Sequence, residues 1–183
     1  LQSRLPLQEL IADLERVRAA VSVPVSTAEP WHVWLEHPEL AEHVDFITVH
    51  LLPYWEQVLL DDAVDSLFER LRQVQARFPG KPVVIGEVGW PSGGETRGGA
   101  VATPAAQAQF VRSFLASAQP LGLDFYLMEA FDQPWKTSIE GRAGPHWGWF
   151  DAYRQPKFAL SGPVLSDAYW PGRALVSCLL GIA

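Results

Sequence analysis

Residues 82–92 have the sequence Pro-Val-Val-Ile-Gly-Glu-Val-Gly-Trp-Pro-Ser, and the rest of the chain is best interpreted around this stretch. Its β-branched residues between a proline and a glycine predict a short buried strand, and Glu87 lies where that strand ends. The neighbouring glycines let a ligand approach the backbone closely, and the face of Trp90 can stack on the C–H surface of a sugar. We therefore expect Glu87 to be catalytic, rather than a structural carboxylate paired with an arginine.

Composition limits the class of partner. Hydrophobic residues make up 48% of the 183 residues and charged residues 19%, as in a globular protein. The formal net charge of −7 disfavours nucleic acid, whose phosphates would be repelled, but does not disfavour a neutral polymer such as a glucan. Cys178 is the only cysteine, so the chain offers neither an internal disulfide nor a thiolate metal site.

Expected helices and strands alternate along the chain. This order predicts an α/β fold with parallel strands, in which functional side chains gather at the carboxyl ends of the strands. Four strands make half of an eight-stranded (β/α)8 TIM barrel, and an isolated half would leave two unpaired edges. We therefore expect residues 1–165 to be the C-terminal half of a barrel whose earlier strands precede Leu1. The expected strands cover residues 23–29, 44–50, 82–88 and 123–131, and the expected helices cover residues 6–21, 35–43, 61–78 and 103–115.

Further carboxylates lie at other strand ends. Glycoside chemistry requires two carboxylates, and Glu29 and Glu129 are both candidates for the second one. Glu129 is favoured because Asp132, Trp135 and Lys136 share its loop and supply hydrogen bonds and a stacking face. Either glutamate could equally be a buried structural acid.

Aromatic residues and one histidine are expected to form the walls of the same cleft. His50 ends a predicted strand, and Tyr54 and Trp55 follow it closely. For Trp31 and Trp135, sugar stacking and ordinary core packing have equal weight. The spacing of the five histidines matches no compact ligand motif, so we expect no metal site.

The C-terminal residues resemble the start of a membrane segment. Tyr169-Trp170-Pro171-Gly172-Arg173 forms an aromatic and cationic flank, and an apolar run begins at Ala174. The run is about half of the ~20 residues that a bilayer span requires. We expect residues 166–183 to be a linker and the start of a transmembrane segment, the alternative being a last core helix.

Three motifs together resemble glycoside hydrolase family 17. They are Val-Ile-Gly-Glu-Val-Gly-Trp-Pro-Ser at 84–92, Glu-Ala-Phe-Asp-Gln-Pro-Trp-Lys at 129–136 and Trp-Gly-Trp-Phe-Asp at 147–151. Residues 26–31 and 50–56 are similar to the bacterial and fungal branch in particular. The resemblance implies a (β/α)8 barrel that acts on β-1,3-glucan, by hydrolysis or transglycosylation, with retention of configuration and without a cofactor.

The resemblance also implies roles for individual residues. Glu87 matches the nucleophile, and Tyr54 would hydrogen-bond near it. The remaining candidates would contact the glucan oligosaccharide or polysaccharide: Trp31, His50, Trp55, Trp90, Glu129, Asp132, Trp135, Lys136 and Glu140.

One element of the family pattern is missing. The acid/base glutamate of the family lies in an Asn-Glu pair at the end of the fourth strand, and this chain contains no asparagine. The four strands would then correspond to strands five to eight, and the chain alone would be inactive. Bacterial members also occur attached to membrane segments and to a processive glycosyltransferase module, which implies a membrane-associated location in the cell envelope, or otherwise secretion.

Two other functions fit the sequence. The aromatic cleft could belong to a non-catalytic glucan-binding or scaffolding domain of a membrane-bound glucan synthase. A metal-dependent barrel hydrolase would require the histidines to converge on one point.

Overall fold

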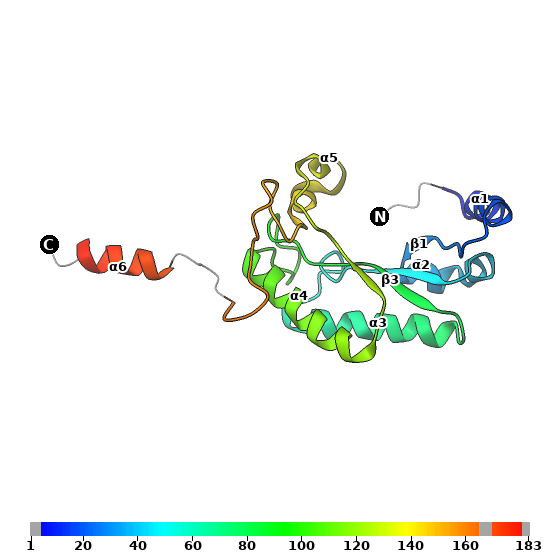
Figure 1. Ribbon diagram of the computed structural model, residues 1–183, viewed down its shortest axis with the longest axis horizontal. Helices are drawn as coiled ribbons and strands as arrows, with labels where there is room; N and C mark the ends of the chain where they lie inside the picture. Colours follow the sequence, from blue (N-terminus) through cyan, green and yellow to red (C-terminus); the bar gives the residue numbers. More distant parts are fainter. Residues whose placement is uncertain (1–4, 165–169, 181–183) are drawn as a thin grey trace.

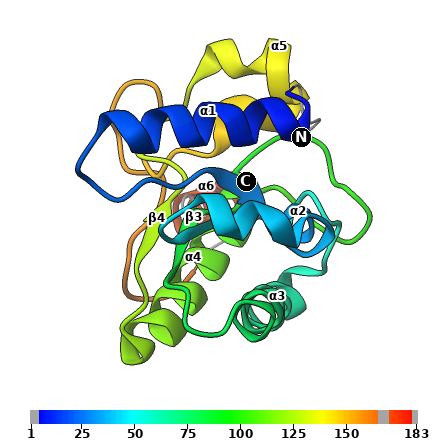
Figure 2. The same cartoon turned by 90° about the vertical axis from the view of Figure 1, so that its right-hand side faces the viewer.

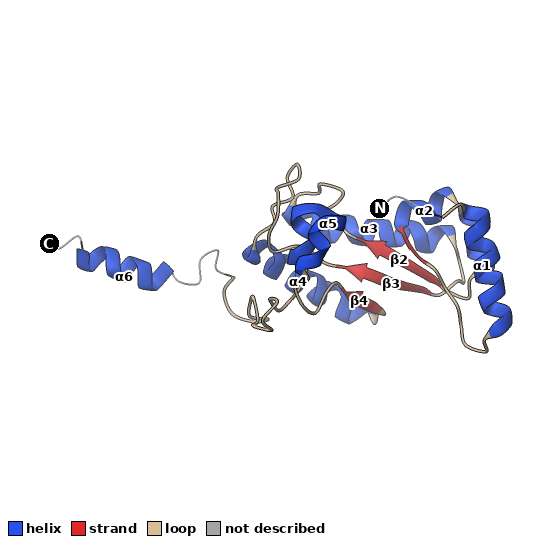
Figure 3. Cartoon of the chain, turned by 90° about the horizontal axis from the view of Figure 1, so that it is seen from above, coloured by secondary structure: helices blue, strands red, loops and turns tan. Residues whose placement is uncertain are grey.

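The computed structural model describes residues 5–164 and 170–180, and its centre is a parallel β-sheet. The alternating β/α order expected from the sequence is confirmed, and Figure 3 shows the strands running in one direction. Each strand pairs with the next one along the chain, in the order β1-β2-β3-β4. The strands are β1 (Ala28–Pro30), β2 (Ile47–Leu51), β3 (Val83–Val88) and β4 (Phe125–Leu127).

The two edge strands are shorter than expected. β1 and β4 contain three residues each, whereas the sequence pattern suggested strands at 23–29 and 123–131. Each of these strands has a single neighbour in the described sheet, so its length is limited to the residues that pair with that one neighbour. The chain before β1 is held by isolated contacts, because the Asp45 amide donates to the Val25 carbonyl oxygen at 2.8 Å and the Ser26 hydroxyl donates to the Phe46 carbonyl oxygen at 2.6 Å.

The two helices of 15 residues, α3 and α4, lie on one side of the sheet. Figures 1 and 2 show α3 and α4 next to each other on the same face, and the rings of Phe68 and Phe114 stack between them at 6.2 Å. Thr103 caps the start of α4, because its hydroxyl accepts a hydrogen bond from the Ala106 amide at 3.1 Å. The α-helices are α1 (Leu7–Ala20), α2 (Trp31–Glu36), α3 (Ala63–Arg77), α4 (Pro104–Ala118), α5 (Thr137–Glu140) and α6 (Trp170–Leu180), and the 3-10 helices are η1 (Pro38–His43), η2 (Leu60–Asp62), η3 (Gln119–Leu121), η4 (Pro134–Lys136) and η5 (Gly141–His146).

The two faces of the sheet differ in chemistry. Along β2, Ile47, Val49 and Leu51 are buried, while Thr48 and His50 between them are only half-buried. Alternate residues of a strand point to opposite faces, so one face is apolar and packs on the helices while the other is polar. Figure 3 views the sheet from the side opposite α3 and α4. Parallel sheets are usually apolar on both faces, so the polar face is the natural place for a site.

A bulge at Gly86 determines which way Glu87 points. Val49 pairs with Ile85, but the next pair is His50 with Glu87, so Gly86 is an extra residue in β3. As a result Ile85 and Val88, three residues apart, are both buried against the helix layer, and Glu87 joins His50 on the polar face. A Cβ at Gly86 would overlap with Cγ2 of Thr48, so any other residue at this position would force Thr48 or the backbone to shift.

Apolar side chains are exposed at both ends of the described chain. On α1 the apolar stripe is only partly covered, and Val17 is 45% exposed. On α6, Leu175 and Leu179 are 63% and 64% exposed. Within the part of the chain that the structure describes, no helix is long and apolar enough to cross a membrane. The linker expected from residue 166 falls on residues 165–169, which lie outside the described residues.

We predict that Gly86→Ala destabilises the protein by about 1–3 kcal/mol, the usual cost of overpacking, because its new methyl group would overlap Thr48. Thr48→Ser removes Cγ2 but keeps the hydroxyl that bonds to Ser26, so it should recover part of this loss in the double variant. Urea unfolding of the two single variants and the double variant measures the coupling. Strictly additive effects of the two substitutions would contradict the assignment of the bulge.

Candidate functional site

Glu87 and His50 form the centre of the candidate site. They are register partners on β3 and β2, and His50 Nδ1 lies 2.6 Å from Glu87 Oε2. This is ion-pair distance, although the ring is not oriented for a straight hydrogen bond and Nδ1 has no other partner. The His50 side chain is 12% exposed and that of Glu87 is 37% exposed. The carboxylate is therefore held by a buried imidazole and is still open to a ligand.

Glu129 lies on the neighbouring loop, directly after β4. Its Oε2 accepts hydrogen bonds from Lys136 Nζ at 2.7 Å and from Gln133 Nε2 at 2.5 Å. Glu129 and Lys136 are 15% and 14% exposed, and Oε1 of Glu129 is buried without a hydrogen-bond partner. One oxygen is thus fixed by two donors, and the other is free to accept a hydrogen bond from a ligand hydroxyl.

Glu140, at the end of α5, belongs to the same electrostatic environment. Burial raises the pKa of its carboxyl group, the charge of Lys136 lowers this pKa, and the charges of Glu129 and Glu87 raise it. Its Oε2 is buried and has no hydrogen-bond partner. Three carboxylates therefore influence one another around a single lysine, an arrangement that favours ligands with hydroxyl donors.

Three tryptophans remain candidates for sugar stacking. Trp31 is half-buried and well oriented, since Nε1 donates to Glu56 Oε1 at 2.9 Å and the guanidinium of Arg70 lies 4.2 Å from the ring centroid. Trp55 is also half-buried, with the guanidinium of Arg97 at 4.8 Å from its ring. Trp135 is 60% exposed, on the loop of Glu129.

The structure corrects the expected roles of Tyr54 and Trp90. Both side chains are completely buried, so neither has a face on which a sugar could stack. The Tyr54 hydroxyl donates to the Glu95 carbonyl oxygen at 2.6 Å, and not near Glu87, while Trp90 Nε1 donates to the Val101 carbonyl oxygen at 2.9 Å. The two rings pack edge to face at 5.8 Å and hold the loops after β2 and β3 together.

Asp132 is likewise a structural residue in this arrangement. Its side chain is 12% exposed, and Oδ1 accepts hydrogen bonds from Lys157 Nζ at 2.7 Å and from the Gly148 amide at 2.9 Å. The expected contact of Asp132 with substrate is therefore not supported, because this oxygen is occupied by internal donors.

Sequence reasoning missed Gln133, Gln107 and Lys157. Gln133 lies inside the motif 129–136 and could have been found as a polar residue of that loop. Gln107 is completely buried on α4 and donates to the carbonyl oxygens of Trp147 and Gly148, both at 3.1 Å. Neither Gln107 nor Lys157 is near its partners in sequence, so no local pattern indicates these contacts.

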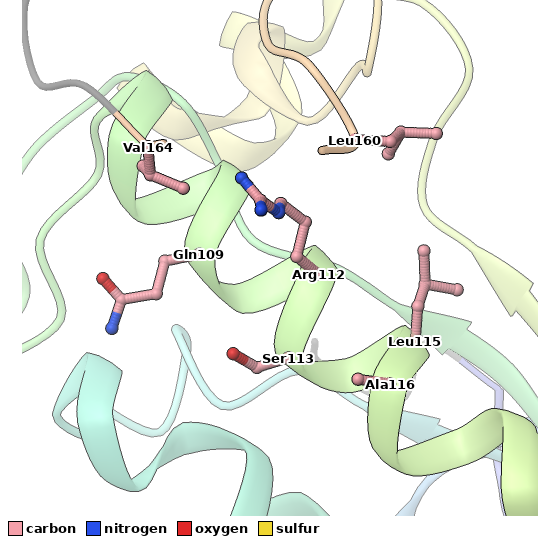
Figure 4. A pocket seen from close by; sticks show the side chains of 7 residues that line it. All are labelled: Gln109, Arg112, Ser113, Leu115, Ala116, Leu160 and Val164. Carbon is pink, nitrogen blue, oxygen red and sulfur yellow. The ribbon is translucent and has the colours of Figure 1, made fainter. Parts of the chain in front are cut away.

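One groove on the surface lies away from the candidate site. It has a volume of about 520 Å³ on the outer side of α4, where the segment containing Leu160 and Val164 passes the helix (Figure 4). None of the predicted site residues lines it. Separately, among residues 5–164 and 170–180, no three His, Cys, Asp or Glu side chains converge to hold a metal ion.

Comparisons with known proteins point to one family. The model of the BtgE/BtgC glycoside hydrolase domain matches residues 1–148. A glucan 1,3-beta-glucosidase of Arthroderma benhamiae is 28% identical over 167 residues, covering 82% of this chain and 54% of that protein. The chain therefore spans about half the length of this curated relative.

Solved structures give the same result. The glycoside hydrolase family 17 beta-1,3-glucanosyltransferase of Rhizomucor miehei superimposes with a TM-score of 0.77 and 27% identity, over 86% of this chain and 59% of that one. An active-site mutant of the same enzyme in complex with laminaritriose gives a TM-score of 0.76 and 26% identity, with the same coverage.

We predict that Lys136→Met lowers the free energy of unfolding by about 1–3 kcal/mol, because it leaves the buried carboxylate of Glu129 without its charged donor. The matched control is Arg72→Met, which breaks a pair that is 64% and 52% exposed and should cost less than about 1 kcal/mol. Chemical denaturation of both variants compares the costs. Equal losses of unfolding free energy in the two variants would show that the Lys136–Glu129 pair stabilises the protein no more than an exposed surface pair does.

The raised pKa of Glu140 gives a prediction for pH dependence. Ionisation of this carboxyl group opposes folding, so its contribution to stability is present below the ordinary pKa and is lost as the pH rises through the raised pKa. Glu140→Gln should therefore match the wild type in acid and become increasingly more stable than it towards neutral pH. Glu69→Gln is the control of opposite sign, since Arg72 lowers the pKa of Glu69. Thermal unfolding across pH tests this, and a pH-independent difference for Glu140→Gln would refute it.

Proposed function

The chain belongs to the BtgE/BtgC glycoside hydrolase domain family, and on that premise we propose that the protein cleaves or transfers β-1,3-glucan with Glu87 as its nucleophile. One observation supports the choice of Glu87 above all: a partly exposed carboxylate at a strand end, turned onto the polar face by a bulge and held against His50. Family relatives are glucan 1,3-beta-glucosidases and a glucanosyltransferase by name.

The proposed reaction proceeds in two displacements. A Glu87 oxygen attacks the anomeric carbon and forms a glycosyl ester, while the glycosidic oxygen leaves with a proton from a general acid. Water or the hydroxyl of a second glucan then attacks the same carbon, loses its proton to the same acid/base group and releases Glu87. Configuration is retained because the carbon is inverted twice. His50 would hold the carboxylate in the position for attack.

We assign the general acid to a residue outside this chain. We do not assign this role to Glu129, because its Oε2 is already occupied by two donors, Lys136 and Gln133. The family pattern places the acid in an Asn-Glu pair, and this chain contains no asparagine. In this proposal the four strands are the fifth to eighth of the barrel.

The carboxylates and open tryptophans would bind the sugar chain. The free oxygens of Glu129 and Glu140 would accept hydrogen bonds from glucose hydroxyls, and Trp31, Trp55 and Trp135 would supply stacking faces. The laminaritriose complex of the Rhizomucor miehei enzyme supports a β-1,3-linked oligosaccharide as ligand. We also infer that residues 1–165 are the C-terminal half of the barrel. We further infer that residues 166–183 lead to a membrane and to a fused glycosyltransferase module in the cell envelope. The exposed leucines of α6 support the membrane attachment.

We predict that Glu87→Gln lowers kcat on laminari-oligosaccharides by at least about 10³-fold, because the amide keeps the shape and removes the nucleophile. The assay uses the complete reading frame that contains this chain, with Glu36→Gln, an exposed glutamate on α2, as the control. Full activity of Glu87→Gln would refute the assignment. Calorimetry with laminaritriose distinguishes an enzyme from a non-catalytic domain. If the wild type binds laminaritriose without turnover, the protein is a glucan-binding or scaffolding domain instead.

A further inference from the structure

Lys157 is a buried cation that joins three loops near the candidate site. Its side chain is 11% exposed, and Nζ donates to Asp132 Oδ1 at 2.7 Å, to Ser92 Oγ at 2.6 Å and to the His146 carbonyl oxygen at 3.2 Å. An ammonium group has three donors, and all three are used. We propose that Lys157 is a positioning residue, which fixes the loop of Glu87 relative to the loop of Glu129. The consequence for catalysis rests on the function proposed above.

The partners of Lys157 are close in sequence to the functional carboxylates. Ser92 follows Glu87 by five residues, and Asp132 follows Glu129 by three and precedes Lys136 by four. None of Ser92, Asp132 and Lys157 lies in a helix or strand, so regular secondary structure does not fix their relative positions. A shared cation fixes them instead, and it does so from 25 residues beyond Asp132.

Backbone hydrogen bonds extend this clamp. The Ser92 amide donates to the His146 carbonyl oxygen at 2.8 Å, which also accepts from Lys157. The Asp132 carboxylate accepts from the Gly148 amide at 2.9 Å in addition to Lys157. Without Lys157, the buried carboxylate of Asp132 would lose its counter-charge, and the loops of residues 89–99 and 130–148 would lose their common partner.

Burial and the neighbouring charges act in opposite directions on Lys157, and its pKa is lowered overall. Burial lowers the pKa of Lys157, and the hydrogen bond and charge of Asp132 raise it, with smaller contributions from Asp151 and Glu129. All three carboxylates therefore act in the same direction, against the cost of burial. Lys157 itself lies beyond residues 1–148, the part that the family model matches, whereas its partner Asp132 lies within that part.

The position of such loops matters for the reaction. A displacement of about 1 Å of a reacting group can cost about 10²-fold in rate, because attack requires near-contact geometry. Lys157 touches none of the reacting groups but fixes the loop of the attacking Glu87 relative to the sugar-binding loop of Glu129, so its removal should lower kcat by a larger factor than it raises KM for the glucan. A residue that serves only global stability would not produce this separation in molecules that remain folded.

The first measurement is hydrogen exchange of the complete protein, comparing Lys157→Met with Lys81→Met. Lys81 is the matched control, since its ammonium donates to the Val44 carbonyl oxygen at 2.6 Å at the opposite end of the sheet. We expect Lys157→Met to speed exchange about tenfold or more at the amides of Ser92, Asp132 and Gly148 and to leave α3 unchanged. Lys81→Met should leave these three amides protected. Unchanged exchange in Lys157→Met would overturn the proposal whatever the enzyme does.

The second measurement is kcat and KM on laminari-oligosaccharides at equal folded fraction. We expect a 10- to 100-fold lower kcat for Lys157→Met, as about 1 Å of misplacement implies, with Lys157→Arg partly restored and Lys81→Met near the wild type. Unchanged kcat in Lys157→Met, or equal losses in the two methionine variants, would overturn the positioning role. If Lys157→Met does not fold, Lys157→Arg and Ser92→Ala are measured in its place. An unchanged kcat in both of these variants would overturn the positioning role of Lys157. If the wild type and Glu87→Gln are both inactive, the proposed function fails, and the clamp is judged by hydrogen exchange alone.

Discussion

The extra residue in β3 is the constraint on which the site depends. In a regular strand Glu87 would lie on the same face as Ile85, against α3 and α4, where its charge would have no counterpart. The bulge at Gly86 reverses the direction of the last two residues, so that Val88 takes the buried position and Glu87 faces His50. The bulge in turn needs Thr48 on the neighbouring strand to meet a residue without a side chain. One glycine thus connects the packing of the core with the direction of the carboxylate.

Around Glu87, the polar side chains that we propose to bind the glucan differ from the buried aromatic side chains that support their loops. Tyr54, Trp90 and Trp147 are completely buried and form an aromatic layer beneath the loops. Above this layer, Glu129 and Glu140 each keep one buried oxygen without a partner. Unsatisfied buried oxygens are costly, and in native proteins they mark positions where a ligand or water completes the hydrogen bonds. The packed aromatic rings therefore support loops whose carboxylate oxygens still lack a hydrogen-bond partner.

Much of the fold and of the candidate site could be predicted from the sequence, and the predictions that failed did so for physical reasons. Glu87 and His50 lie near the carboxyl ends of neighbouring strands, and the parallel β/α pattern determines which end of the sheet a residue occupies. Tyr54 and Trp90 were misassigned because an aromatic residue at a strand end can turn outward to a ligand or inward to the core, and only the packing of other loops decides between them. Asp132 was misassigned because its partner, Lys157, comes from a segment distant in sequence. Strand ends at the sheet edges were overestimated because pairing there depends on a single neighbour.

The separation of chemistry between the two faces of the sheet also bears on how such a protein can change over evolutionary time. Substitutions at Ile47, Val49 or Ile85 must respect the volume of a close-packed interior, so this layer tolerates little variation. Residues that alternate with them face away from the helices, so substitutions on the polar face leave the packing behind the sheet undisturbed, although Thr48 and His50 are themselves constrained by their contacts with Gly86 and Glu87. The chemistry of the polar surface can therefore change over evolutionary time while the scaffold behind it is kept.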